Sequence, residues 1–178
     1  MRIVGGTAGG RRLATPAGRA TRPTSDRVRE GLFSSLGGDL SGRSFLDLYA
    51  GSGAVGLEAA SRGAASVVLV ERDAKALHAI RENVAALGFD GVAVRAEDVS
   101  RFLREPATPY DAIFVDPPYA DSIDGVLALL VDGGWVAAGG VVVVERDTRG
   151  AAVTWPHGIE EDRSRRYGDS TLWYGRRP

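Results

Sequence analysis

The segment Asp116-Pro117-Pro118-Tyr119 is the part of the sequence whose residue types are best suited to chemistry. An ionised Asp116 only accepts hydrogen bonds, and Pro117, which Pro118 holds extended, leaves its carbonyl oxygen free as a second acceptor. Two adjacent acceptors suit one exocyclic NH₂ group. Tyr119 offers an aromatic face on which a flipped-out base can stack, an interaction worth about 1–3 kcal/mol. The segment therefore predicts a site for an amino group on a planar base; the alternative is a strand that ends in a type I turn.

The residues before this segment predict a buried strand that leads into it. Residues 110–115 are apolar and rich in β-formers, and two prolines end the strand because neither can donate to a β-ladder. In an open α/β sheet, the carboxyl ends of the strands face the ligand crevice. We therefore expect Asp116 to lie at that crevice.

The wider pattern is one of alternating strands and helices. It predicts strands at residues 44–48, 67–70, 92–95, 110–115 and 140–145, and helices at residues 26–36, 55–62, 73–87, 99–104 and 123–130. This alternation predicts an α/β fold with a parallel sheet covered on both faces. Residues 158–176 predict a final hairpin at the sheet edge, and residues 2–6 and 11–14 predict a small N-terminal β-hairpin.

A glycine motif indicates a nucleotide-like cofactor. Gly51, Gly53 and Gly56 form a G-x-G-x-x-G pattern between a strand and a helix, and Glu71 follows the first glycine by 20 residues. Sites for NAD and for S-adenosylmethionine share this pattern, because both use close backbone approach and an acid that accepts from ribose hydroxyls. Asp47, inside the strand end, disfavours a pyrophosphate and suits the ammonium and sulfonium groups of S-adenosylmethionine.

Acidic residues end four successive predicted strands. They are Asp47, Glu71, Asp98 and Asp116. Chance placement of all four is improbable, which favours a methyltransferase over a dehydrogenase. For any one of them the alternative is a helix cap or a solvated strand end.

Charge is concentrated near the N-terminus. Residues 1–29 hold seven arginines and one acid, a net charge of +6, so the remainder carries −7 in a chain of net charge −1. This predicts a phosphate-binding surface that includes Arg2, Arg11, Arg12, Arg19, Arg22 and Arg27. Arg22, Thr24 and Arg27 could instead face the cofactor pocket, or only begin a capped, solvated helix.

Composition limits the remaining classes. The 178 residues contain no cysteine and two histidines, which excludes disulfides and a cysteine-linked intermediate and disfavours a zinc site. No apolar run approaches the ~20 residues of a membrane span. We therefore expect a cytoplasmic protein that binds neither membrane nor metal, with a basic hairpin and linker at residues 1–24 and one catalytic domain at residues 25–178.

Several segments together resemble one family, the bacterial 16S ribosomal RNA guanine-N2 methyltransferases whose target is guanine 966. They are residues 2–6, 10–13, 22–30, 46–53, 116–119 and 167–169. The most specific is Arg22-Pro-Thr-Ser-Asp-Arg-Val-Arg-Glu30. Tyr49 stands where phenylalanine is expected in many relatives, and Arg12 where lysine is common.

The resemblance implies a Rossmann-like, seven-stranded and mostly parallel methyltransferase sheet. It implies that S-adenosylmethionine methylates the N2 amine of a guanine in 16S ribosomal RNA, in a small subunit or an assembly intermediate, with the enzyme acting as a monomer. The cofactor-binding residues would be Asp47, Tyr49, Ala50, Gly51, Ser52, Gly53, Gly56, Glu71, Arg72, Asp98 and Val99, and Asp98 would accept from the adenine amino group. The catalytic residues would be Asp116, Pro117, Pro118 and Tyr119.

Two other functions stay open from the residues themselves. Asp-Pro-Pro-Tyr recognises an amino group rather than one base, so adenine N6 or a protein amide could be the acceptor. A non-catalytic RNA-binding assembly module with the same fold is the alternative outside the enzyme class.

The sequence also leaves two roles open for the N-terminal residues. In the first, residues 1–22 form an RNA-docking arm that adds little to the core fold. In the second, they cover the cofactor pocket as a lid.

Overall fold

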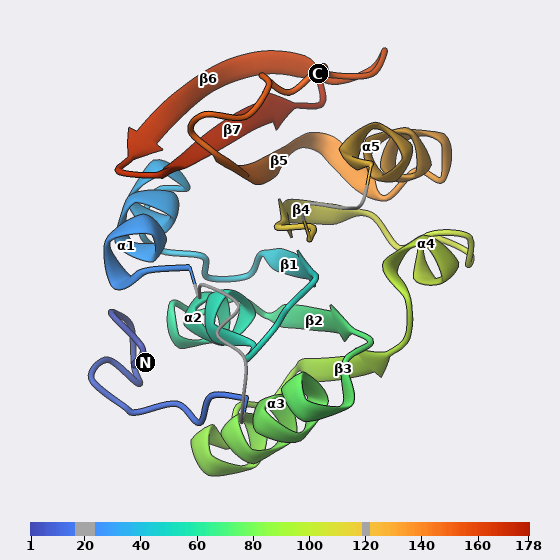
Figure 1. Ribbon diagram of the computed structural model, residues 1–178. Helices are drawn as coiled ribbons and strands as arrows, with labels where there is room; N and C mark the ends of the chain where they lie inside the picture. Colours follow the sequence, from blue (N-terminus) through green and yellow to red (C-terminus); the bar gives the residue numbers. More distant parts are fainter. Residues whose placement is uncertain (17–23, 119–121) are drawn as a thin grey trace.

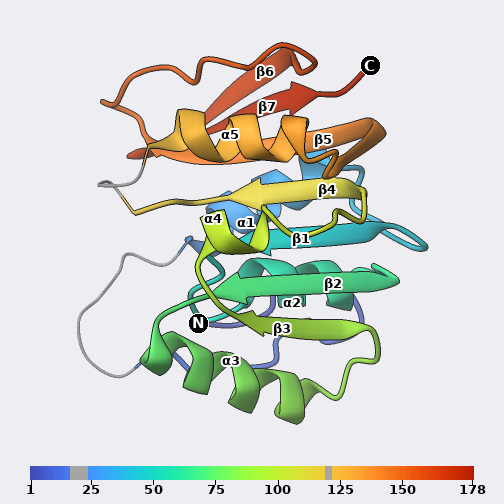
Figure 2. The ribbon, with the colours of Figure 1, turned by 90° about the vertical axis from the view of Figure 1, so that its right-hand side faces the viewer.

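The computed structural model describes residues 1–16, 24–118 and 122–178, and in these residues seven strands form one sheet. The strand order is β3-β2-β1-β4-β5-β7-β6. The strands are β1 (Ser44–Leu48), β2 (Ser66–Glu71), β3 (Val92–Ala96), β4 (Tyr110–Val115), β5 (Val136–Asp147), β6 (Glu160–Tyr167) and β7 (Ser170–Arg176). Strands β1 to β5 are parallel, and β7 runs antiparallel between β5 and β6. The arrowheads of β2, β3 and β4 therefore reach the same edge (Figure 2).

Helices cover both faces of this sheet. Helices α1 (Asp26–Ser35), α2 (Ala54–Ser61) and α3 (Ala74–Leu87) lie on one face, and α4 (Val99–Phe102) and α5 (Ile123–Asp132) on the other (Figure 1). Each face has its own apolar core, centred on residues such as Phe33 and Phe45 on the first and Leu127 and Trp135 on the second. The predicted α/β architecture is confirmed.

Local capping explains where the helices begin and end. Ser25 accepts a hydrogen bond from the Val28 N–H and starts α1, and Asp73 caps α3 in the same way. Gly88 ends α3 in the left-handed conformation, with φ at 64°. Because these signals are local, most predicted boundaries agree with the structure to within one or two residues.

One predicted boundary was wrong by more than that. Strand β5 begins at Val136 rather than at residue 140, because Gly139 and Gly140 form an irregularity within the strand instead of its start. Helix α4 ends at Phe102, two residues before its predicted end.

The predicted N-terminal hairpin is reduced to one antiparallel bridge, between Arg2 and Arg12. The backbone N–H groups that would have extended the β-ladder donate to helix α2 instead. The N–H of Val4 donates to Glu58 at 2.7 Å, and the N–H of Thr7 donates to the Ser61 carbonyl at 2.7 Å. The N–H groups of Ile3, Gly10 and Leu13 donate to the carbonyls of Arg11, Ile3 and Met1, so the predicted antiparallel pairing is present but short, and helix α2 binds the remaining donors.

This N-terminal segment is part of the apolar core. Ile3 is fully buried and Leu13 is 6% exposed, both within the cluster formed by α1, α2 and the sheet. Such burial contradicts the prediction that residues 1–22 add little to the core fold.

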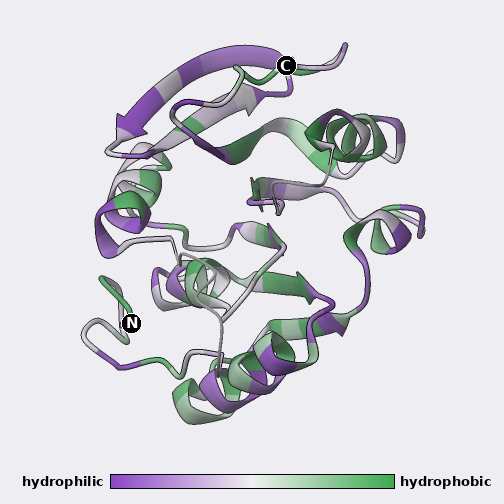
Figure 3. Ribbon diagram, in the orientation of Figure 1, coloured by the Kyte–Doolittle hydropathy of each residue, from purple (hydrophilic) through white to green (hydrophobic). Residues whose placement is uncertain are grey.

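The edge strand β6 is hydrophilic along most of its length (Figure 3). Charged residues on an edge strand oppose pairing with other chains. Among the described residues, no helix is long and apolar enough to cross a lipid bilayer.

Candidate active site

The strand order reverses between β1 and β4, and this switch point organises the predicted site. Leu48 pairs with Val115, so the loop after β1 and the segment that begins at Asp116 leave the sheet side by side. The Asp116 N–H lies 3.5 Å from the Leu48 carbonyl oxygen. The structure thus brings the predicted base-binding and cofactor-binding segments together.

Glu71 closes the glycine loop. One carboxylate oxygen accepts from the Gly51 N–H at 2.8 Å, and the other accepts from the N–H groups of Arg72 and Asp73 at 2.7 and 2.8 Å. Tyr49, at the start of the loop, has a φ of 64°, a left-handed conformation that costs a non-glycine residue energy. The loop is therefore held in a defined shape from strand β2.

Asp47 lies beneath this loop, with 1% of its surface exposed. Its carboxylate accepts from the Gly56 N–H at 2.8 Å and so anchors the first turn of α2. Burial raises the pKa of Asp47 to about 7, opposed by the Gly56 hydrogen bond and assisted by the charge of Glu71. A side chain on Gly56 would collide with Leu69, which explains the third glycine of the motif.

Asp98 begins helix α4, as the helix-cap alternative predicts. One oxygen accepts from the N–H groups of Ser100 and Arg101, and the other lies 2.9 Å from the Arg72 guanidinium. Its side chain is 43% exposed, so capping leaves it accessible beside the end of β3. Val99 is buried and faces the core.

Asp116 belongs to a row of three acids on one face of the sheet. The register sets Asp47 beside Phe114 and Val115 beside Val144, so its continuation sets Asp116 beside Glu145 of β5. Burial raises the pKa of Asp116 well above its ordinary value, and the charges of Glu145 and Asp47 raise it further.

The sequence analysis did not identify Glu145 as a site residue. Glu145 ends the strand predicted at residues 140–145 and lies two residues before the end of β5, so the criterion used for the four predicted acids would have found it in the fifth strand. Pro117 and Pro118 follow Asp116 at the surface of the site. Tyr119, Arg19 and Arg22 lie outside the described residues.

The described arginines predicted to bind RNA do not form one surface. Arg2 pairs with Asp26 at 3.2 Å, and Arg27 is exposed on the first turn of α1, near the site. Arg11 donates to the Ala86 carbonyl at the C-terminal end of α3, which lies away from the carboxyl ends of the strands. Arg12 is exposed.

Asn83 connects the N-terminal segment to the glycine loop. Its side-chain amide donates to the carbonyls of Ala14 and Ser52, each at 3.0 Å, and its oxygen accepts from the Ala14 N–H at 2.7 Å. Asn83 is 3% exposed. The segment therefore touches the loop predicted to hold the cofactor, as the lid alternative requires.

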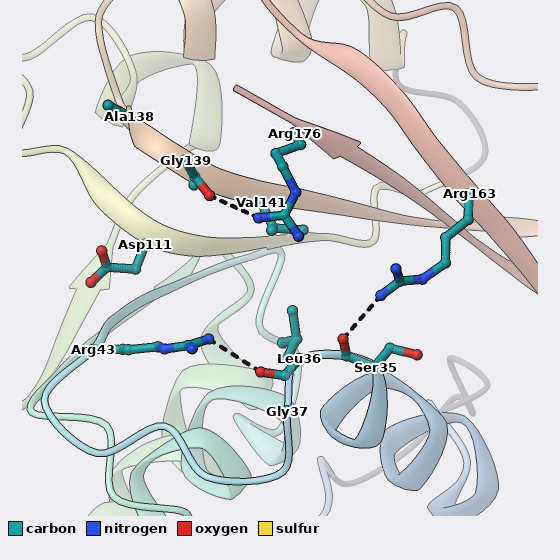
Figure 4. A pocket seen from close by; sticks show the side chains of 11 residues that line it. Ser35, Leu36, Gly37, Arg43, Asp111, Ala138, Gly139, Val141, Arg163 and Arg176 are labelled. Atoms are coloured by element: carbon teal, nitrogen blue, oxygen red, sulfur yellow. Dashed lines mark hydrogen bonds between the residues drawn. The ribbon is translucent and has the colours of Figure 1, made fainter. Parts of the chain in front are cut away.

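A pocket of about 440 Å³ lies at the opposite edge of the sheet (Figure 4). Arg43 and Arg163 donate to the carbonyls of Leu36 and Ser35, and Arg176 donates to that of Gly139. None of the described residues predicted to bind a ligand lines it. Its guanidinium groups are engaged in holding loops, so the acid row marks the more suitable site for chemistry.

Comparison with known proteins relates the whole chain to methyltransferases. Residues 1–176 match the model of the family described as conserved hypothetical protein 95. The Ribosomal RNA small subunit methyltransferase D of Escherichia coli is 38% identical over 157 residues, which cover 88% of this chain and 79% of that protein. The solved structure of yhhF from Escherichia coli, described as a candidate methyltransferase, is 34% identical to this chain, with a TM-score of 0.91. The alignment covers 99% of this chain and 97% of the yhhF chain.

A more distant structure shares the fold alone. The 16S rRNA N2 G1207 methyltransferase of Thermus thermophilus, solved with AdoMet and guanosine, is 23% identical with a TM-score of 0.69. That alignment covers 91% of this chain and 44% of the Thermus protein. Both solved structures therefore share the Rossmann-like methyltransferase architecture with this chain.

Proposed function

The chain belongs to the family described as conserved hypothetical protein 95, and from this premise we propose that it methylates the N2 amine of a guanine in 16S ribosomal RNA, with S-adenosylmethionine as the methyl donor. A fold of this kind hosts many reactions, so the fold alone does not select one. The observation that carries the proposal is the 38% identity with the Ribosomal RNA small subunit methyltransferase D of Escherichia coli over 88% of the chain.

The residues of the glycine loop fit S-adenosylmethionine. Gly51 and Gly53 have φ values of 58° and 78°, a conformation that favours glycine, and a Cβ on Gly51 would meet no atom within 4 Å, so a ligand can approach the Gly51 backbone closely. Glu71 and Asp98 present carboxylates at the ends of β2 and β3, suited to ribose hydroxyls and to an adenine amino group respectively. Both carboxylates retain lone pairs beyond the backbone hydrogen bonds that they already accept.

The Asp116 side chain and the Pro117 carbonyl would orient the target amine. When bound, S-adenosylmethionine supplies an activated methyl group, whose bond to sulfur breaks as the bond to N2 forms. Hydrogen bonds from both N–H groups to these acceptors direct the nitrogen lone pair towards the methyl group. N2 loses one proton as it gains the methyl group. The raised pKa of Asp116 suits its carboxylate to accept that proton.

The partner would be 16S ribosomal RNA, in a small subunit or an assembly intermediate, and the enzyme would act as a monomer in the cytoplasm where such RNA is found. The exposed Arg27 on the first turn of α1 and the β6–β7 hairpin, which lies at the same edge of the sheet as the acid row, would supply positive charge for RNA phosphates.

Methyl transfer from labelled S-adenosylmethionine tests the proposal. Free 16S ribosomal RNA and small subunits, both lacking the modification, are incubated with the enzyme, digested, and resolved as nucleosides. We expect N2-methylguanosine from the wild type and none from Asp116→Asn, which keeps the shape of the side chain.

The other possible products separate the alternatives. Label in N6-methyladenosine or in protein would assign the enzyme to a different acceptor. RNA binding by the wild type without any transfer would indicate a non-catalytic assembly module.

A further inference from the structure

Glu145 occupies the position next to Asp116 at the carboxyl edge of the sheet. Strands β4 and β5 pair Phe114 with Val143 and Val115 with Val144, so Asp116 and Glu145 are the next residues in the same parallel register. Side chains at equivalent register positions lie on the same face of a sheet. The carboxylates of Asp116 and Glu145 therefore both face the side of the sheet that carries α1 and α2.

The side chain of Glu145 is fixed at one oxygen. The hydroxyl of Thr24, just before α1, donates to Glu145 Oε2 at 3.0 Å, which leaves Oε1 available to accept. Within residues 1–16, 24–118 and 122–178, no arginine or lysine forms an ion pair with Glu145. Glu145 is half-buried, and its charge raises the pKa of Asp116. Two neighbouring carboxylates that pair with no cation in the described part of the chain favour a ligand that offers several hydrogen-bond donors in a row.

We propose that Glu145 accepts a hydrogen bond from the N1–H of the target guanine while Asp116 and Pro117 accept from its N2 amine. This inference rests on the proposed function and identifies the residue that selects the base. Guanine presents N1–H and the N2 amine side by side, which together provide three donors for three neighbouring acceptors. A flipped base is read along this edge.

The same arrangement rejects adenine. Adenine places its N6 amine beside N1, which carries a lone pair and no hydrogen. With the adenine amine on Asp116 and Pro117, that lone pair would face Glu145, and two acceptors would be left unpaired in a partly buried site. Glu145 is thus a specificity-determining residue, in contact with the ring rather than with the reacting nitrogen.

The test replaces guanine by 2-aminopurine, which keeps the amine that is methylated but has a bare lone pair at N1. The probe is 16S ribosomal RNA in the form that the wild type methylates, with guanine or 2-aminopurine at the methylated position. We expect the wild type to prefer guanine by about 10- to 100-fold in kcat/KM, the effect of one hydrogen bond to a charged group.

Two variants separate base reading from a structural role. Glu145→Gln can turn an amide N–H towards the N1 lone pair of 2-aminopurine. The ratio of kcat/KM on guanine to that on 2-aminopurine should therefore be lower in this variant than in the wild type, by about tenfold or more. Glu145→Ala should lose activity on guanine and retain it on 2-aminopurine. Glu161→Gln, at an exposed acid on β6, which β7 separates from β5, is the control and should keep the wild-type preference. Calorimetric titration of S-adenosylmethionine checks that each variant is folded.

The outcomes separate the inference from the function on which it rests. An equal loss of activity on both bases in Glu145→Gln would overturn the inference, because it would show that Glu145 only supports the site. A wild type that methylates no guanine at N2 would overturn the proposed function, and the inference with it.

Discussion

The guanidinium Nε of Arg29 lies 3.8 Å from Oε2 of Glu58, and both side chains are fully buried. Arg29 also donates to the carbonyls of Thr24 and Arg2, while Glu58 accepts from the N–H of Val4 at 2.7 Å. This pair therefore connects helices α1 and α2 to the backbone of the N-terminal segment. Charged groups so deeply buried are tolerated because each has several partners.

Glu58→Ala should be strongly destabilising. Removal of the carboxylate leaves the buried Arg29 with only the half-exposed Asp26 carboxylate, at 2.8 Å, as an ion-pair partner among the described residues, and leaves the N–H groups of Val4 and Gly5 without their acceptors. We expect a loss of about 3–5 kcal/mol in the free energy of unfolding, measured with urea. Glu82→Ala, at an exposed position on α3, serves as the control. A loss below about 1 kcal/mol would show that the pair is not a structural link.

Ile3→Ala tests whether the N-terminal segment belongs to the core. Ile3 is fully buried, so the variant should lose about 2–5 kcal/mol of stability through lost transfer energy and the cavity left behind. Thermal unfolding measures the change. An unaltered melting temperature would restore the original prediction that residues 1–22 are only a docking arm.

The elements and residues that the sequence predicted well are those set by local signals. The glycine loop between β1 and α2, Glu71 at the end of β2 and Asp116 at the end of β4 each depend on a strand followed directly by turn or helix residues. Parallel topology then brings those strand ends to one edge without further information. This is why the predicted strand ends meet at one edge, while the binding and catalytic roles of their residues stay predictions.

Contacts between distant segments could not be predicted in this way. The N–H of Val4 donates to Glu58, 54 residues away, and the N–H of Ala14 donates to Asn83, 69 residues away, and no local pattern encodes either contact. The N-terminal residues therefore read as a free hairpin. Likewise, the proximity of Glu145 to Asp116 follows only from the pairing of β4 with β5.

Arg27 and Arg11 form a matched pair for RNA binding. Arg27 is exposed on the first turn of α1 near the acid row, whereas Arg11 lies at the far end of α3. Arg27→Ala should weaken RNA binding and reduce the slope of log K against log salt by about 0.7–0.9, as expected for one lost phosphate contact. Arg11→Ala should leave the slope unchanged. Equal changes in both variants would place the RNA across the N-terminal segment as well.

The pKa of Asp47 predicts how stability depends on pH. It is raised from 3.8 to about 7 in the folded protein, so its contribution to stability is fully present below about pH 4 and is lost as pH rises through 7. Asp47→Asn keeps an oxygen for the Gly56 N–H and should abolish this loss, which we expect to reach about 3 kcal/mol between pH 5 and 8. Urea unfolding across this range measures it. Asp90→Asn, at an exposed position, is the control, and a parallel pH dependence in wild type and Asp47→Asn would contradict the assignment.

The last prediction separates base binding from cofactor binding. Asp116 and Glu71 end different strands, β4 and β2, and only Glu71 contacts the glycine loop, through the Gly51 N–H. Asp116→Asn should therefore abolish turnover while leaving the affinity for S-adenosylmethionine within a few fold. Glu71→Ala should weaken that affinity by about 1–3 kcal/mol, because ribose hydroxyls lose their acceptor.

Glu71 also holds the loop, so a second variant is needed to separate the two effects. Glu71→Gln keeps one oxygen that can accept from the Gly51 N–H but removes the charge, and it should bind S-adenosylmethionine more tightly than Glu71→Ala. Calorimetric titration of the cofactor into each variant, together with methyl transfer to 16S ribosomal RNA, measures both quantities. Equal losses of cofactor affinity in Asp116→Asn and Glu71→Ala would contradict the division, because the two acids would then serve one continuous pocket.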